Sequence, residues 1–405
     1  MIHLLFCLEI TNHPLILIPG SFGSRLTVSS ISEKNATKCS KSLSFFPFWI
    51  SYKMLLPSNL RCFFHWLTLD YDDDKKEIVD QPNIDIVPFD FGGIEGVRGV
   101  GGKMFGKIIR PYYEPIIQEL IKHNFSIGET IFGAPYDWRL GVLQRDNFYN
   151  NLTNLVEHSY KLTGKKVNFL THSFGANVLH HYLIYHTSPE WRQKYINCVV
   201  FAAPSFSGSG KSIVVYYRRS LPSILKHIHI KQLDEMLGNF PILFSHFPNH
   251  IIFENETVFI SPEGENITAP KVIDFLKKVN KINSKQLKIA HDHIIYTSHF
   301  HEALDVPVRI IYNSGMPTPF GLKLNDLNGD GEVIYNDGDG TIMSKGIDMV
   351  CEKWKLNGTD IQCRNYNTSD IRGKHQSFIS RKESIDTLLE WLADTRNMNN
   401  KEEEL

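Results

Sequence analysis

The chain has 405 residues, of which 42% are hydrophobic and 21% charged, and its formal net charge is −1. This composition is that of a folded globular protein, long enough for one large α/β core with a smaller appended region. The balanced charge argues against nucleic acid as the main partner, and no apolar run reaches the roughly 18 residues that an integral membrane span requires.

The first predicted element is a buried strand over residues 13–18, HPLILI, which leads into the loop residues 19–24, PGSFGS. Two glycines directly after a buried strand indicate a loop whose backbone approaches another group closely. Residues 1–10 are apolar but contain no basic stretch, and a signal peptide needs roughly 15–30 residues. We therefore find no convincing signal peptide, and a truncated N-terminus is one explanation.

Aromatic side chains concentrate in the next segment, residues 43–69. Beside isolated basic residues, such a cluster is either a hydrophobic core or a surface at a membrane interface, and the residues alone favour core. The cluster consists of Phe45, Phe46, Phe48, Trp49, Phe63, Phe64 and Trp66.

Three further elements precede the centre of the chain. Residues 70–76, DYDDDKK, are predicted to form a solvated turn. Residues 112–123 have the pattern of an amphipathic helix, and residues 127–134 form a strand that ends in the segment PYDWR.

The stretch KKVNFLTHSFGAN is the most informative one. A buried strand at residues 167–170 is followed by a sharp turn and by a helix over residues 176–186. This order is typical of a nucleophile elbow, in which a strained backbone lifts the hydroxyl of Ser173 above the sheet. Gly175 is required because a side chain there would collide with neighbouring backbone. Thr171 departs from the pattern, which has a small residue at that position.

The alternation of strands and helices is interrupted after a buried strand at residues 195–203. Residues 204–219 are rich in Gly, Ser and basic residues, and Phe-rich amphipathic stretches continue to about residue 259. An inserted cap or lid would produce this interruption. The alternation resumes with a strand at residues 306–312, and the last predicted helix covers residues 382–391.

A serine nucleophile needs a base, and the base needs an orienting carboxylate. The acid candidate is Asp339, which lies between glycines after the strand Glu332–Tyr335. The base candidate is His375, which precedes the terminal helix. The order Ser173, Asp339, His375 is that of an α/β-hydrolase. The oxyanion hole would use the backbone N–H groups of Phe174 and Ser21.

Two other motifs compete with this interpretation. Residues 205–212, SFSGSGKS, resemble a phosphate-binding loop, but Ser205 replaces its first glycine, so we do not favour nucleotide binding. Residues 326–337 imitate a calcium-binding loop without its bidentate Glu or its flanking helices, so a hairpin is favoured. The sequence predicts neither a metal nor an organic cofactor.

Seven Asn-x-Ser/Thr sequons and six cysteines favour an oxidising compartment, although each sequon is weak on its own and six free thiols remain possible. The cysteine spacing fits no zinc site. The sequons begin at Asn35, Asn124, Asn151, Asn255, Asn266, Asn357 and Asn367, and the cysteines are Cys7, Cys39, Cys62, Cys198, Cys351 and Cys363.

Several segments together resemble one family, the lecithin:cholesterol acyltransferases with the related lysosomal phospholipase/transacylases, and the lysosomal branch is expected to be the nearer one. GAPYDWR and DGDGT are specific to this family among hydrolases. The matching segments are HPLILIPGSFGSRL, FWISYKMLLP, GAPYDWR, THSFG, YINCVVFAAPSFSG, GMPTPF and DGDGT, in family order.

The resemblance implies an α/β-hydrolase in which Ser173, with Asp339 and His375, cleaves a phosphatidylcholine-type ester and passes the acyl group to water or to a lipid alcohol such as a sterol or ceramide. It implies secretion or a lysosomal location, and phospholipid membranes or lipoprotein-like surfaces as partners. A catalytically weakened lipid-binding relative is the alternative. The implied membrane-binding subdomain is closed by a Cys39–Cys62 disulfide, with Phe48, Trp49, Phe63, Phe64 and Trp66 as membrane-binding residues.

The predicted organisation has six parts. Residues 1–38 start the core with the oxyanion loop, 39–70 form the membrane-binding subdomain, 71–205 continue the core with the elbow, 206–300 form the cap, with the lid at about 206–245, 301–395 complete the core, and 396–405 are a polar tail. Two departures from the family stand out. Family members usually have Asp where this chain has Ser21. The usual partner position of Cys351 is Ile310, so Cys351 either pairs with Cys363 or stays free.

Overall fold

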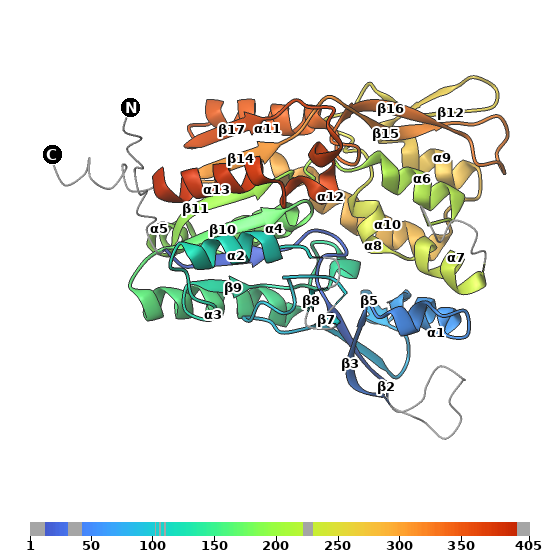
Figure 1. Cartoon of the computed structure of the whole chain (residues 1–405). Helices are drawn as coiled ribbons and strands as arrows, with labels where there is room; N and C mark the ends of the chain where they lie inside the picture. Colours follow the sequence, from blue (N-terminus) through green and yellow to red (C-terminus); the bar gives the residue numbers. More distant parts are fainter. Residues whose placement is uncertain are drawn as a thin grey trace.

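The computed structural model describes residues 13–30, 43–101, 103–104, 107–108, 111–221 and 230–394. These residues fold around a parallel sheet with helices on both faces, and two smaller regions lie beside it (Figure 1). No helix in the described ranges is long and apolar enough to cross a membrane.

The central sheet has six strands in the order β17-β14-β11-β10-β1-β9, and all neighbours are parallel. Helices cover both faces, which explains why the strands read as continuous apolar runs such as LILI in β1. The strands predicted at 13–18, 127–134, 167–170, 195–203 and 306–312 are all present, with slightly different ends. Their bounds are β1 Leu15–Ile18, β9 Ile131–Gly133, β10 Val167–His172, β11 Ile196–Ala202, β14 Val308–Tyr312 and β17 Ile361–Asn365.

Successive strand residues contribute to opposite faces of this sheet. Leu15 and Leu17 of β1 belong to one buried cluster, together with residues of α2 and α13. Ile16 and Ile18 belong to the other, together with residues of α3, α4 and α11. The helix bounds are α2 Glu114–Lys122, α3 Asp146–Thr163, α4 Gly175–Tyr185, α5 Pro189–Tyr195, α11 Ser344–Leu356, α12 His375–Phe378 and α13 Lys382–Asp394.

The aromatic segment forms a separate small region at one corner of the molecule (Figure 1). Its antiparallel sheet has the order β3-β2-β6, and a hairpin, β4–β5, carries the charged turn. Cys62 is disulfide-bonded. Cys39 lies outside the described residues, so its pairing with Cys62 stays a prediction. The bounds are β2 Leu26–Ser30, β3 Leu43–Trp49, η1 Tyr52–Leu55, α1 Leu60–Leu67, β4 Leu69–Asp72, β5 Glu77–Asp80, β6 Ile84–Pro88, β7 Lys103–Met104 and β8 Lys107–Ile108.

The burial of the aromatic side chains corrects the expectation of an exposed aromatic surface. Phe48, Phe63, Phe64 and Trp66 are 0–5% exposed and pack against one another. They form the interior of the region because an amphipathic α1 turns its apolar face onto β3. Of the five residues expected to bind membranes, Trp49 alone is partly exposed.

The segment between β11 and β14, called the cap here, consists mainly of helices. Its role as a cap or lid stays a prediction. Helix α7 of the cap packs against α1 of the aromatic region. Strands of the cap and of the C-terminal region form a second sheet, β13-β12-β15-β16. The bounds are α6 Gly210–Arg218, α7 Lys231–Gly238, α8 Pro241–Ser245, β12 Thr257–Ile260, β13 Asn266–Thr268, η4 Ala269–Lys271, α9 Val272–Lys278, α10 Ser284–Thr297, η5 Ser298–His301, β15 Met316–Lys323 and β16 Glu332–Gly338.

Two of the alternatives left open by the sequence are resolved. Cys351 of α11 forms a disulfide with Cys363 of β17. Ile310 of β14 is paired in register with Cys363, so the cysteine partner lies one strand away from the position that the family pattern indicates. The segment resembling a calcium-binding loop, residues 326–337, begins in the turn of the β15–β16 hairpin and continues into β16. In the turn, Asp326 accepts the N–H groups of Asn328 and Gly329.

Candidate active site

The elbow lies at the carboxyl end of β10, in the middle of the sheet. Ser173 has a φ of +55°, a left-handed conformation that is uncommon for a residue with a side chain. A Cβ at Gly175 would lie only 2.5 Å from the carbonyl oxygen of Pro19 and 2.6 Å from that of Ile18. Glycine is therefore needed where α4 starts against the first loop, as the sequence predicts.

The structure brings together the three residues that the sequence predicts to act with one another. The Oγ of Ser173 lies 2.8 Å from Nε2 of His375, and Nδ1 of His375 lies 2.7 Å from Oδ2 of Asp339. The carboxylate of Asp339 can only accept a hydrogen bond, so Nδ1 of His375 carries the proton. Nε2 of His375 is then free to accept a hydrogen bond from the serine hydroxyl. All three side chains are buried.

Backbone donors fix the carboxylate of Asp339. Its Oδ1 accepts the N–H groups of Thr341 and Ile342, at 2.9 and 2.8 Å, while Oδ2 faces the imidazole. The backbone N–H of His375 also donates to the carbonyl of Asp339, at 3.1 Å. The loop after β16 and the segment before α12 are thereby held in register, which sets the geometry of the acid and the base.

The two predicted oxyanion donors flank the serine. Ser21 lies in the loop after β1, and Phe174 follows Ser173 directly. A Cβ at Gly20 would lie 2.7 Å from the Cβ of Ser173, so the loop is pressed against the nucleophile. Within the described part of the chain, the backbone N–H groups of Ser21 and Phe174 donate to no protein acceptor. Both are therefore available to a ligand.

Two further residues belong to the site and were missed in the sequence. Tyr112 accepts the N–H of Gly20 at 2.9 Å and hydrogen-bonds Nδ1 of His172. Nε2 of His172 then donates to the carbonyl of His375, at 3.2 Å. Burial and the nearby charge of His375 lower the pKa of His172 well below its ordinary value, so it stays neutral. No local signal marks Tyr112, which is 60 residues from its partner.

Thr171 remains the unusual residue of the elbow. Its side chain is fully buried, and its Oγ1 has no hydrogen-bond partner within the described part of the chain. Its neighbours in the sheet are Ile18 and Phe201. We find no structural reason for a threonine here.

Comparison with known proteins identifies the family. The family model described as lecithin:cholesterol acyltransferase matches residues 45–309. The chain belongs to the lecithin:cholesterol acyltransferase family. The predicted fold class, an α/β-hydrolase with added regions, is also confirmed by the parallel sheet and its elbow.

Curated relatives come from both branches of the family. The phosphatidylcholine-sterol acyltransferases of Mus musculus and Homo sapiens are each 26% identical over 362 residues, covering 86% of this chain and 78% of theirs. The lysosomal phospholipase A and acyltransferase of Mus musculus is 23% identical over 353 residues, covering 84% of this chain and 82% of its own. These identities do not single out the lysosomal branch.

One solved structure is similar over nearly its whole length. A chain in the crystal structure of the Tle4–Tli4 complex has a TM-score of 0.52 at 12% sequence identity, covering 95% of this chain and 98% of that one. At this identity the likeness shows the fold alone.

The segment resembling a phosphate-binding loop is hydrogen-bonded to α4 and to the loop that follows Asp339. Ser205 donates to Asn177, Ser207 to the carbonyl of Met343, and Ser209 to the carbonyl of Thr341. Lys211 donates to the Thr341 hydroxyl at 2.6 Å. With these groups engaged in protein contacts beside the Asp339 loop, nucleotide binding is not favoured.

The aromatic region reaches the active site of this family member through three rings. The Trp49 indole N–H donates to the carbonyl of Phe22 at 2.9 Å, and both rings pack against Trp138. Phe22 follows Ser21, so the aromatic region and the oxyanion loop are in direct contact. Sequence reasoning placed these residues in separate parts.

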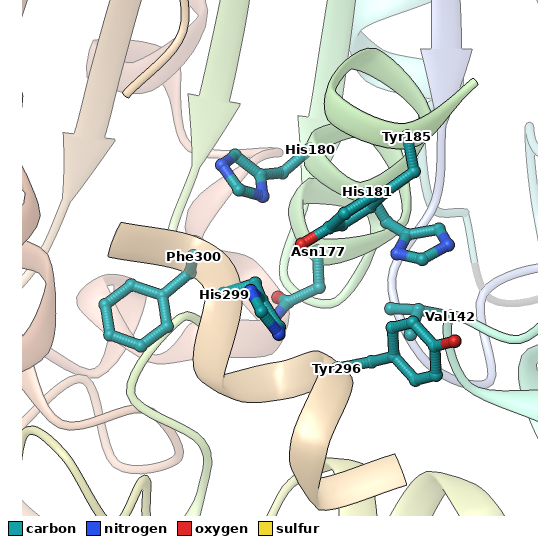
Figure 2. A pocket seen from close by; sticks show the side chains of 8 residues that line it. All are labelled: Val142, Asn177, His180, His181, Tyr185, Tyr296, His299 and Phe300. Carbon is teal, nitrogen blue, oxygen red and sulfur yellow. The ribbon is translucent and has the colours of Figure 1, made fainter. Parts of the chain in front are cut away.

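A small pocket next to α4 is distinct from the catalytic groups. Figure 2 shows His181 and Tyr185 of α4 facing Tyr296 of α10 and His299 of η5. Nδ1 of His181 is buried without a hydrogen-bond partner in the described residues. Within those residues, no group of three or more His, Cys, Asp or Glu side chains is arranged to hold a metal ion.

Proposed function

We propose that this protein is a serine phospholipase and O-acyltransferase that forms an acyl-enzyme on Ser173. The observation that carries the proposal is the continuous series Ser173–His375–Asp339, with hydrogen-bond distances of 2.8 and 2.7 Å. A catalytically weakened lipid-binding relative is disfavoured because such a protein has no need to keep this alignment in a strained elbow.

The first half-reaction follows from these contacts. His375 Nε2 takes the proton of the Ser173 hydroxyl as Oγ attacks the ester carbonyl of the phospholipid. The N–H groups of Ser21 and Phe174 stabilise the negative oxygen of the tetrahedral intermediate, and Asp339 stabilises the imidazolium. His375 then gives its proton to the departing oxygen, and lysophospholipid leaves with Ser173 acylated.

The second half-reaction reverses the proton path. Water or a lipid alcohol loses a proton to His375 Nε2 as its oxygen attacks the acyl-enzyme, and the proton returns to Ser173. The names of the relatives, phosphatidylcholine-sterol acyltransferase and lysosomal phospholipase A and acyltransferase, support phosphatidylcholine as donor and both kinds of acceptor.

Contact with the lipid surface is proposed at the turn between η1 and α1. Leu56 is 53% exposed at this turn, and the exposed basic residues Lys53 and Arg61 flank it. Apolar side chains with basic neighbours suit the interface of a phospholipid bilayer. The partly exposed Trp49 stacks on Phe63 of α1 and packs against Phe22, which is 39% exposed and follows Ser21.

An extracytoplasmic location, secreted or lysosomal, is supported by two features. Disulfides persist in oxidising compartments, and the six described sequon asparagines are all exposed. Asn35, the seventh, lies outside the described residues.

The proposal is tested with phosphatidylcholine liposomes that carry a labelled acyl chain and contain either a sterol or ceramide, at pH 4.5 and 7.4. Purified protein should release labelled fatty acid or form the labelled ester of one alcohol. Ser173→Ala should lose both products, whereas Ser380→Ala, with a hydroxyl outside the site, should keep them. Products formed at near wild-type rate by a folded Ser173→Ala variant would contradict the proposal.

A further inference from the structure

A histidine of the cap lies directly over the predicted oxyanion hole. His246 follows α8, its side chain is buried, and its ring centroid lies 4.7 Å from that of Phe174. Its Nε2 lies 3.4 Å from the Oγ of Ser21. The two residues that would supply the oxyanion donors therefore both contact one side chain from the cap.

The hydrogen bonds of His246 define its tautomer. Nδ1 lies 2.9 Å from the carbonyl oxygen of Ile242, which can only accept, so Nδ1 carries a proton. Burial, with a further contribution from the charge of His375, lowers the pKa of His246 to about 4. The ring is thus neutral above that pH, Nε2 has a lone pair, and the Ser21 hydroxyl must be the donor.

We propose that His246 is a positioning residue of the oxyanion hole, where its Nε2 accepts the hydroxyl of Ser21 and so aims the backbone N–H of Ser21 at the substrate carbonyl. The inference rests on the proposed function and deepens it. Because the Ser21 hydroxyl points to His246 of the cap, the group of Ser21 that donates a hydrogen bond to the oxyanion is its backbone N–H.

The backbone of His246 anchors the same arrangement. Its carbonyl accepts the N–H of Ser209 at 2.7 Å and the hydroxyl of Ser212 at 2.8 Å. These two residues lie at the start of α6, so α6, α8 and the loop after β1 are joined at one residue, by its backbone carbonyl and its side chain. The cap therefore acts on the oxyanion hole through this side chain as well as covering the site.

The titratable groups around His246 leave its imidazole neutral over the pH range of the test. His375 is the charge that acts on it from α12. On α10, His293 contacts Ser245, and burial lowers the pKa of His293 to about 3. In the short helix η2, Trp138–Leu140, which packs against α8, Arg139 is paired with Asp137. The effect of replacing His246 should therefore be the same at every pH from about 5.5 to 9.

The test compares two replacements of similar size. His246→Phe keeps the packing against Phe174 but removes the acceptor, whereas His246→Gln keeps an acceptor oxygen near Nε2. With a soluble p-nitrophenyl ester, the Phe variant should lose roughly 5- to 10-fold in kcat, the range expected for one hydrogen bond, with little change in KM. The Gln variant should recover most of the loss.

Coupling with Ser21 separates positioning from a merely structural role. Ser21→Ala should match the Phe variant, and the double variant should lose no more than either single change, because both remove the same bond. The inference would be overturned if the kcat losses of the two single variants multiplied in the double variant. A kcat of the Gln variant no higher than that of the Phe variant, or a change in KM without a change in kcat, would also overturn it. If His246→Phe does not fold, Ser21→Ala on the loop still tests the bond.

Labelling with an organophosphonate distinguishes this inference from the proposed function, because the reagent reacts with an activated serine and places an oxygen in the oxyanion hole. No labelling of Ser173 in the wild-type protein would contradict the proposed function. Wild-type labelling with an equal rate in His246→Phe would leave the proposed function intact and overturn the role of His246.

Discussion

The imidazole of His172 donates from Nε2 to the main-chain carbonyl of His375, 3.2 Å away, and the two ring centroids are 4.7 Å apart. The residue before the nucleophile therefore supports the backbone of the general base. Through Tyr112 the same histidine is tied to Gly20 in the oxyanion loop. The three loops that meet at the serine thus share one hydrogen-bonded path.

Replacing Tyr112 with Phe should break this path. The N–H of Gly20 and Nδ1 of His172 would both lose their buried partner, at about 1–3 kcal/mol of unfolding free energy each. We expect kcat to fall about 10-fold because the oxyanion loop is released. Tyr113→Phe is the matched control, since its hydroxyl bonds the carbonyl of Ile18 and does not contact His172. Equal kcat losses in the two variants would contradict the path.

Asp339→Asn should reduce kcat by roughly 10⁴-fold with little change in stability. An amide at this position favours the wrong tautomer of His375 and cannot stabilise the imidazolium. Asp337→Asn, two residues earlier and exposed, is the control, because Asp337 binds the N–H of Gly315 and the hydroxyl of Ser344. Fatty-acid release is measured for both variants. A similar loss of kcat in Asp337→Asn would contradict the role of Asp339 as the carboxylate that orients His375.

The fold should become less stable as pH falls below about 6.5. Burial lowers the pKa of His181 to about 3, with charges of His186, His180 and His299 adding to it. The folded state keeps this group neutral while the unfolded state takes up a proton near its ordinary pKa of about 6.5. For such a group, the free energy of unfolding is about 2 kcal/mol lower at pH 5 than at neutral pH. This loss stops growing once the pH is below the pKa of the group in the folded state.

Urea unfolding at pH 7.5 and 5.0 measures this effect. His181→Leu, in the pocket of Figure 2, should reduce the difference between the two pH values by about 2 kcal/mol. His291→Leu changes an exposed histidine and should leave the difference unchanged. A pH difference that is the same in wild type and His181→Leu would show that His181 is protonated in the folded state.

Leu56→Ser should weaken binding to phosphatidylcholine liposomes several-fold and leave hydrolysis of a soluble ester unchanged. The side chain is half exposed at the η1–α1 turn and contributes apolar area to the interface. Leu356→Ser is the control, since that leucine is 87% exposed at the end of α11, far from α1 in Figure 1. Sedimentation with liposomes measures binding, and an equal loss in both variants would rule out a specific contact at the turn.

Mass mapping without reduction should recover Cys351 linked to Cys363 and Cys39 linked to Cys62. Cys198 should react with a thiol reagent only after unfolding, because it is buried and burial raises its pKa to about 12. Free Cys39 and Cys62 in the native protein would contradict the disulfide-closed subdomain.

The sequence predicts the parts of this site that have a local motif or a fixed order along the chain, and it misses contacts between distant segments that have neither. The elbow is a contiguous strand, turn and helix, and Asp339 and His375 follow from their order along the chain. Tyr112 and His246 could not be predicted, because each meets its partner only after folding, across 60 and 225 residues. For the aromatic cluster, the residues alone favour a core, and the structure agrees, since Phe48, Phe63, Phe64 and Trp66 pack against one another. The expectation of an exposed surface came from the family resemblance.

The buried charges around Arg139 limit what can be exchanged between relatives. Its guanidinium lies 2.8 Å from Asp80 and 2.6 Å from Asp137 and donates to the carbonyl of Trp66. Burial raises the pKa of Asp80, but Arg139 and Arg145 outweigh it and hold that pKa below its usual value. Removing one partner would leave a buried charge uncompensated. The aromatic region is thus not a detachable module, and a chimera that grafts it from another family member must carry Arg139 and its acidic partners with it.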